Sequence, residues 1–312
     1  MQFDRICTII TAGSTYLDID AYACVVAMAE LLRLQGENAI AYSKAPYNYS
    51  VCDFLTEESH IARQLPEGMS EENAKYIIVD VSDPGFLKDS VPLAKVVAIY
   101  DHHVGFEKYW KSRIGDAAKI EFVGAAATLI YREWQQAGLQ DRMSCSTALL
   151  LIAAILDNTL NLASSNTTDE DREVFQALCR HADADDMFRA LYFSKVQENV
   201  EADLENALRS DMKRIGQNPI LPSTMMQLCV WDADGMLGRL AEIRRWFGGM
   251  DGAWMLNLID IKHYCGYFVC DDKQRQEVLE KAFGIRFEEA IAKLKKPYLR
   301  KQIIKRSLDL MR

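Results

Sequence analysis

Short apolar runs and one longer amphipathic stretch alternate over the first third of the 312-residue chain. Runs of strand length separated by helical patterns are typical of a parallel β-sheet that helices cover on both faces. We therefore predict an α/β fold with a parallel sheet in the first part of the chain. The predicted strands cover 5–13, 39–44, 75–83 and 95–103, and the first predicted helix covers 20–35 and ends at Gly36.

Helical patterns dominate the middle of the chain. The stretches 124–136 and 146–162 are strongly apolar, and 167–182 begins with threonines and acidic residues, which are favourable at a helix N-terminus. The charged stretch 185–213 is also predicted to be helical and to bridge two domains. The predicted organisation is a first domain at 1–190, a helical linker at 191–215 and a C-terminal domain at 216–312.

The last third of the chain has a different sequence pattern, which predicts short strands and two helices. The length also favours two domains over one. We predict a second, smaller α/β domain, with a functional site in the cleft between the two. Its expected strands cover 225–231, 253–261 and 265–270, and its expected helices lie near 237–246 and 273–283.

Composition limits the partners and the compartment. The formal net charge is −9, so the surface as a whole repels polyanions, and an anionic substrate needs a local positive patch or metal ions. Nucleic acid is therefore an unlikely partner, except as short oligonucleotides. The eight cysteines include no C-x-x-C pair, which favours reduced core thiols, and no apolar run reaches the roughly 18 residues of a membrane span. We predict a cytoplasmic protein without a membrane segment.

Carboxylates and imidazoles follow the ends of three predicted strands. Because the carboxyl ends of parallel strands meet at one edge of a sheet, these side chains are expected to converge there. Each feature alone has an ordinary explanation, a helix cap for the D-x-D sequence and a surface loop for the histidine pair. Together they are the donors that suit Mg²⁺ or Mn²⁺, and two such ions can activate water against phosphorus. The residues are Asp18, Asp20, Asp80, Asp101, His102 and His103.

At these residues the sequence resembles the DHH phosphoesterases, in the branch with a DHH-associated C-terminal domain. That branch holds manganese-dependent inorganic pyrophosphatases, exopolyphosphatases and prune-type proteins. The resemblance spans nearly the whole chain, and four blocks in order carry it. They are "GSTYLDIDA" at 13–21, "IIVDVSD" at 77–83, "IYDHH" with "EFVGAAATLI" within 99–130, and "AAILDNTLNLASSNTTDED" at 153–171.

The resemblance implies a role for each matching residue. It implies two divalent ions, Mn²⁺ or Mg²⁺, with Asp80 bridging them, Asp101 supporting the site and His103 facing the phosphate as a candidate general acid. The implied catalytic residues are His103, Asp101 and Asp80. The implied metal ligands are Asp18, Asp20, Asp80, His102 and either Asp157 or Asn158. The implied substrate-binding cations are Lys213, Arg300 and Lys301; taken alone, their basic segments are also typical of solvated helix faces.

The sequence departs from the family pattern at three places. The pyrophosphatases have a ligand histidine where this chain has Ser14, and the family's ligand aspartate aligns with Asn158, one residue after Asp157. Leu299 stands where the family has an arginine. We therefore expect weak, exchangeable metal binding that can favour Mg²⁺ over Mn²⁺. Whether one or two ions bind stays open at this point.

Three functions fit these observations. The first is a metal-dependent hydrolase of phosphoanhydride bonds in inorganic pyrophosphate or polyphosphate, acting on a small phosphorylated or inorganic phosphate substrate. The second is a phosphodiesterase on short oligonucleotides or cyclic dinucleotides, although the glycine-rich G-G-G-H motif of that branch is absent. The third is a retired scaffold that binds a phosphorylated ligand or a protein. An exposed sheet edge could also support a homodimer.

Overall fold

The computed structural model of the chain describes residues 7–309 except 14, 58–60, 67–72, 216–219, 248 and 251. The chain divides into two units, Met1–Arg189 and Ala190–Arg312, and each is described by itself. The predicted two-part α/β architecture is confirmed. The predicted domain boundaries and the interdomain cleft stay predictions.

The first unit is built on a parallel sheet of five strands in the order β2-β1-β3-β4-β5. After β1, the chain first adds β2 on one side of it and then adds β3, β4 and β5 on the other side, so the strand order reverses at β1. In open parallel sheets, ligands bind at the carboxyl ends of the strands near such a reversal. The strands are β1 (Cys7–Thr11), β2 (Ala39–Ala41), β3 (Ala74–Val79), β4 (Val96–Asp101) and β5 (Ala118–Ile120). They are shorter than predicted, so Asp80, His102 and His103 lie in the loops that follow them.

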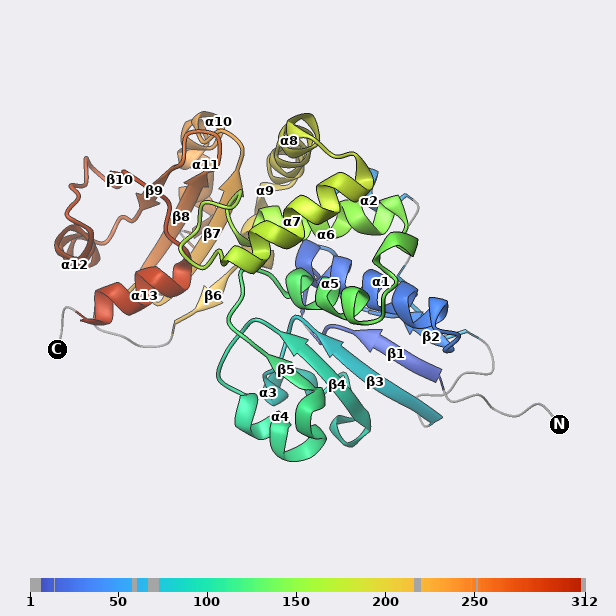
Figure 1. The fold of residues 1–312 in the computed structure, drawn as a ribbon. Coiled ribbons are helices and arrows are strands. Elements are labelled where there is room, and N and C mark those ends of the chain that lie inside the picture. Colours follow the sequence, from blue (N-terminus) through green and yellow to red (C-terminus); the bar gives the residue numbers. More distant parts are fainter. Residues whose placement is uncertain are drawn as a thin grey trace. The chain divides into compact units, whose positions relative to one another are not determined.

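Helices cover both faces of this sheet, as predicted (Figure 1). Helices α1 (Ile19–Leu34) and α5 (Ala126–Gln136) lie on one face, with α6 (Cys145–Asn158) packed against both. Helices α3 (Pro84–Leu87) and α4 (Glu107–Ile114) lie on the other. The remaining helices are α2 (Asp53–Thr56), α7 (Asp169–Ala182), which packs on α6, and α8 (Asp186–Ala202), which runs into the second unit.

Local sequence signals place the helices that carry the site. The Asp18 carboxylate caps α1 by accepting from the Ala21 N–H at 2.9 Å, so α1 begins directly after the first strand's loop. Thr168 and Asp171 form a capping box at the start of α7. On the opposite face of the sheet, the fully buried Trp110 of α4 donates its indole N–H to the Ser82 carbonyl at 2.6 Å. This contact fixes the loop that follows β3.

The second unit has a mixed sheet of five strands in the order β10-β9-β8-β7-β6, in which only β7 and β8 are parallel. Its strands are β6 (Lys213–Arg214), β7 (Thr224–Val230), β8 (Trp254–Asp260), β9 (Cys265–Val269) and β10 (Ile291–Leu294). Its helices, after α8, are α9 (Leu204–Ser210), α10 (Asp234–Gly238), α11 (Leu240–Phe247), α12 (Lys273–Phe283) and α13 (Arg300–Asp309). The helical stretch predicted to reach Lys213 was wrong at its end, because the helix stops at Ser210 and Lys213 pairs with Met225 in the sheet.

The sequence predicts reduced cysteines and no membrane-spanning segment. All eight cysteines are free, and six of them are buried, which agrees with reduced core thiols. Among the described residues, no helix combines the length and the apolar character that crossing a bilayer requires.

Candidate functional site

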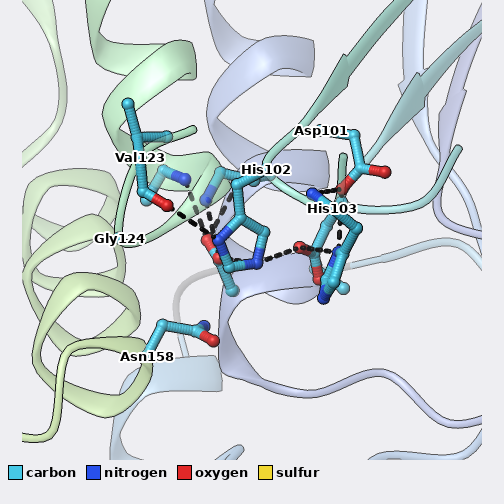
Figure 2. A network of polar contacts seen from close by, with 12 residues as sticks. Asp101, His102, His103, Val123, Gly124 and Asn158 are labelled. Atoms are coloured by element: carbon cyan, nitrogen blue, oxygen red, sulfur yellow. Dashed lines mark hydrogen bonds and ion pairs between the residues drawn. The ribbon is translucent and has the colours of Figure 1, made fainter. Parts of the chain in front are cut away.

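The loops after β1, β3 and β4 bring the acidic and imidazole side chains together at the carboxyl edge of the first sheet (Figure 2). Nε2 of His102 lies 3.5 Å from Oδ1 of Asp80 and 4.0 Å from Oδ2 of Asp20. Nδ1 of His103 lies 4.0 Å from the same Asp80 oxygen and 2.9 Å from Oδ1 of Asp101. The convergence expected from the sequence is therefore present in the first unit alone.

Asp20 is held by the backbone at the start of α5. Its carboxylate is fully buried in the first turn of α1, and its two oxygens accept from the N–H groups of Ala126 at 2.7 Å and Ala127 at 2.9 Å. The Cys24 thiol donates to the same carboxylate at 3.4 Å. Helix N-termini stabilise negative charge, so this carboxylate is fixed in place and oriented toward His102.

Asp80 follows β3 in a left-handed backbone conformation, with φ of 58°. Non-glycine residues adopt this region rarely, and aspartate and asparagine do so more readily than most. The side chain is only 7% exposed. Its Oδ1 is buried and makes no hydrogen bond among the residues that the structure describes. Buried polar atoms nearly always have a partner, so this oxygen is suited to an ion or a ligand.

His102 is oriented by a main-chain carbonyl. The ring is 5% exposed, and its Nδ1 lies 3.2 Å from the carbonyl oxygen of Val123. A carbonyl can only accept, so Nδ1 carries the proton and Nε2 of the neutral ring presents a lone pair toward Asp80 and Asp20. An imidazole whose other nitrogen donates to a carbonyl is the usual arrangement of a histidine that binds a metal.

The carboxylates destabilise one another in the absence of a cation. Burial, followed by the charge of Asp18, raises the pKa of Asp20 to about 8. Burial, followed by the charges of Asp20, Asp18 and Asp101, raises the pKa of Asp80 well above its ordinary value. A divalent cation between these groups would relieve both the repulsion and the desolvation.

Asp101 and His103 form a second pair, in which the carboxylate is buried and the imidazole ring is exposed. The Asp101 carboxylate is fully buried, and burial acts to raise its pKa, but hydrogen bonds from His103 and Ser82 lower it overall. The His103 ring is 57% exposed. Because Asp101 accepts from Nδ1, the other ring nitrogen of His103 remains available to a substrate.

The donor set fits divalent metal ions of the Mg²⁺ and Mn²⁺ type. Carboxylate oxygens and one imidazole nitrogen are the ligands that these ions prefer. The fit is supported by the orphaned Oδ1 of Asp80 and by the tautomer of His102. An Asp80 oxygen and ring nitrogens of His102 and His103 all lie within 4.8 Å of one another, so the histidine assigned to the substrate borders the proposed ligands.

The remaining predicted ligands are less well defined. Asn158 is the last residue of α6, and its main-chain carbonyl accepts from the Asn166 amide at 3.4 Å. In Figure 2 no dashed line joins the Asn158 side chain to the histidines and aspartates. The choice between Asp157 and Asn158 stays a prediction, and Ser14 lies outside the described residues.

The predicted substrate-binding cations lie in the second unit. Lys213 is exposed on β6 and Lys301 is exposed in the first turn of α13. Although Lys301 is exposed as a residue, the surrounding protein partly desolvates its ammonium group, and this desolvation, followed by the positive charge of Lys213, lowers the pKa of Lys301. The Arg300 guanidinium is 10% exposed and pairs with Asp211 at 2.8 Å. Its role toward substrate, like those of the lysines, stays a prediction.

Sequence reasoning missed the groups that orient the ligands. These are the Val123 carbonyl, the N–H groups of Ala126 and Ala127, and the buried carboxylate of Asp171. The backbone groups belong to small or apolar residues, and the residue type does not indicate which hydrogen bonds the backbone makes. Asp171 was visible only as an acidic residue at a helix start.

Comparisons with known proteins find relatives that cover most of the chain. No family model matches the sequence. The chain is 24% identical to a Listeria innocua protein named "Probable manganese-dependent inorganic pyrophosphatase", over 91% of this chain and 92% of that protein. It is also 24% identical to a protein of the same name from Deinococcus radiodurans, over 94% and 95%.

Solved structures share the fold. A crystal structure titled "Methanococcus jannaschii putative family II inorganic pyrophosphatase" matches with a TM-score of 0.66 and 20% identity, over 97% of this chain and 98% of that one. An exopolyphosphatase-related protein from Bacteroides fragilis matches with a TM-score of 0.51 and 11% identity, over 98% and 92%. The resemblance to the DHH phosphoesterase branch that holds the manganese-dependent inorganic pyrophosphatases and the exopolyphosphatases is confirmed.

Proposed function

We propose that this relative of the manganese-dependent inorganic pyrophosphatases is a metal-dependent phosphohydrolase that cleaves phosphoanhydride bonds. Its substrate is inorganic pyrophosphate or polyphosphate, and its cofactors are two divalent ions, Mn²⁺ or Mg²⁺. The names of the full-length relatives support this reaction. One observation of the structure supports it most directly: His102 presents Nε2 to the buried carboxylates of Asp20 and Asp80, and the buried Asp80 oxygen beside it has no hydrogen-bond partner within the described part of the chain.

The ligands proposed for the ions are Asp18, Asp20, Asp80 and His102, with Asp157 or Asn158 completing the set. When bound, such ions polarise a phosphoryl oxygen and lower the pKa of a water molecule toward about 7, so that it can attack phosphorus. The N–H groups of Ala126 and Ala127 hold the Asp20 carboxylate in its orientation, and the Val123 carbonyl holds the His102 ring.

His103 and Asp101 act on the substrate side. Asp101 accepts the Nδ1 proton of His103, which leaves the exposed edge of the ring directed away from the carboxylate. When both of its ring nitrogens are protonated, His103 can donate a proton or a hydrogen bond from Nε2 to the phosphoryl group that develops charge during transfer. The net charge of −9 disfavours the binding of an anionic substrate. In the second unit, Lys213 and Lys301 supply local positive charge that can bind phosphate oxygens.

The test is phosphate release from pyrophosphate, tripolyphosphate and long-chain polyphosphate, each with Mn²⁺, Mg²⁺ or a chelator. Asp80→Asn is the blank, because asparagine tolerates the left-handed backbone while a ligand charge is lost. Asp89→Asn is the matched control, since Asp89 is exposed in the turn after α3. We expect metal-dependent release that falls by about 100-fold or more in Asp80→Asn and is unchanged in Asp89→Asn.

Other outcomes of this experiment would contradict the proposed hydrolase or support one of the two alternative functions. No release from any of the three substrates, with metal bound, contradicts the proposal. Release from cyclic dinucleotides or short oligonucleotides in the same series would instead support a phosphodiesterase. Metal or phosphate binding without turnover of any substrate would support a retired scaffold.

A further inference from the structure

One short stretch of backbone contacts two of the proposed metal ligands. Residues 121–128, called the ligand-holding segment here, connect β5 to the first turn of α5. Its Val123 carbonyl accepts from His102 at 3.2 Å, and its Ala126 and Ala127 N–H groups donate to Asp20 at 2.7 and 2.9 Å. The orientation of both ligands therefore depends on where this segment lies.

The segment is anchored by a carboxylate that belongs to a distant part of the chain. Asp171 is fully buried in the first turn of α7, 47 residues after Gly124. One of its oxygens accepts from the Gly124 N–H at 2.8 Å, and the other accepts from the Thr128 hydroxyl at 2.5 Å. These two contacts flank the residues that meet Asp20.

The contact at Gly124 leaves no room for movement toward Asp171. A Cβ atom at Gly124 would lie 2.6 Å from an Asp171 oxygen and 2.6 Å from the Thr159 methyl group. The backbone at Gly124 thus packs closely against Asp171 of α7 and against Thr159, the C-cap residue of α6. Packed backbone at this distance transmits a displacement of the carboxylate to the segment.

Asp171 also has an ordinary role, which must be separated from this one. It accepts from the N–H and the hydroxyl of Thr168 at 2.7 Å each, and so completes the capping box of α7. A capping acid alone, however, has no need of partners outside its helix. Here two of the donors, on Gly124 and Thr128, belong to the ligand-holding segment.

We propose that Asp171 is a positioning residue for the metal centre, which fixes the ligand-holding segment so that Asp20 and His102 point at a common cation. This inference rests on the proposed function, because the ligand roles of Asp20 and His102 come from it. Asp171 acts through this segment and does not contact the cation itself. Residues that hold metal ligands in place in this way commonly set the orientation of those ligands.

Four variants separate positioning from capping. Asp171→Ala removes both roles, and Thr168→Ala removes the capping hydroxyl but keeps the carboxylate. Thr128→Val removes one anchor of the segment without touching the cap. Asp171→Asn is the conservative variant, because its amide oxygen can accept from Gly124 while its NH₂ group donates to the Thr128 hydroxyl.

Two readouts are used on the full chain. The first is the dissociation constant for Mn²⁺, measured by calorimetry. The second is the tautomer of His102, read from nitrogen chemical shifts in the metal-free protein. In Asp171→Ala we expect the Mn²⁺ dissociation constant to rise by about 10- to 100-fold and His102 to lose its single Nδ1–H tautomer. Asp171→Asn should recover most of the affinity, Thr128→Val should show a smaller rise, and Thr168→Ala should change neither readout.

The proposal is overturned if Asp171→Ala folds, binds Mn²⁺ like the unmodified protein and keeps one His102 tautomer. It is also overturned if Thr168→Ala raises the dissociation constant as much as Asp171→Ala does, since capping then explains the effect. Should Asp171→Ala fail to fold, Thr128→Val decides by the same two readouts. If the unmodified protein binds no Mn²⁺, the proposed function fails, and the metal-free tautomer measurement still decides the positioning role.

Discussion

Asp101 and His103 are joined by two hydrogen bonds that end on a single oxygen. Oδ1 of Asp101 accepts from the His103 main-chain N–H at 3.0 Å and from its ring Nδ1 at 2.9 Å. Backbone and ring are therefore fixed together, although more than half of the ring is exposed. An exposed side chain held this firmly is suited to meet a substrate.

The first prediction concerns this histidine. His103→Ala should lower kcat by about 100-fold, because a positioned proton donor typically contributes a factor of that order. The Mn²⁺ dissociation constant should stay within about threefold, since Nδ1 of His103 already serves Asp101. Steady-state kinetics and calorimetry measure the two effects. A large loss of metal affinity would make His103 a ligand instead, and His181→Ala, in the last turn of α7, is the control histidine.

The second prediction tests the close approach at Gly124. Gly124→Ala should lower the free energy of unfolding by about 1–3 kcal/mol, because the new methyl group would overlap Asp171 and Thr159 in a packed interior. Urea denaturation of the metal-free protein measures the change. Gly238→Ala is the control, since its added methyl group meets nothing within 4 Å. Equal stability of the two variants would contradict the packing described here.

The third prediction concerns the lysine pair of the second unit. Lys213→Ala should raise the pKa of Lys301, because removing a neighbouring positive charge favours the protonated ammonium group. The desolvation of Lys301 is unaffected, so the pKa should recover only in part. An NMR titration of the lysine side chains measures this directly. Lys195→Ala, on α8, is the control; an unchanged pKa in Lys213→Ala would mean that the two groups are apart in solution.

The fourth prediction concerns Arg300. Its guanidinium pairs with Asp211 and also donates to the Met225 carbonyl at 3.3 Å. Arg300→Ala should cost about 3 kcal/mol of unfolding free energy, because it leaves a partly buried carboxylate without its partner. Arg209→Ala, which breaks an exposed pair with Glu205, should cost less than about 1 kcal/mol. Chemical denaturation compares them, and similar small losses would show that Arg300 is not structural.

Much of the fold could be predicted because its core elements are long or strongly patterned. Strands β3 and β4 and helices α1 and α6 bury nearly continuous apolar runs. The strands that were missed are short and sit at sheet edges. Strand β5 has three residues and β6 has two, and their lysines and arginine read as loop or helix. Pairing with a neighbouring strand, which no local pattern reveals, makes them strands.

The site could be predicted only as a set of side chains. The D-x-D and DHH sequences predicted which carboxylates and imidazoles form the site, because these residues follow predicted strands that end at the same edge of the sheet. The contacts that aim those groups come from backbone. Val123 and Ala126 have side chains without polar atoms, yet their carbonyl and N–H orient His102 and Asp20. Such contacts depend on tertiary packing and leave no trace in residue type.

The left-handed backbone at Asp80 constrains how this protein's lineage can change. Glycine, asparagine and aspartate adopt that conformation readily, whereas most other residues strain it. A change to asparagine requires a single base substitution and leaves the turn after β3 undisturbed. Given the metal role proposed for Asp80, one base substitution would remove a ligand charge and leave the turn intact, so the residue at position 80 would distinguish relatives that keep the proposed metal site from relatives that have lost it.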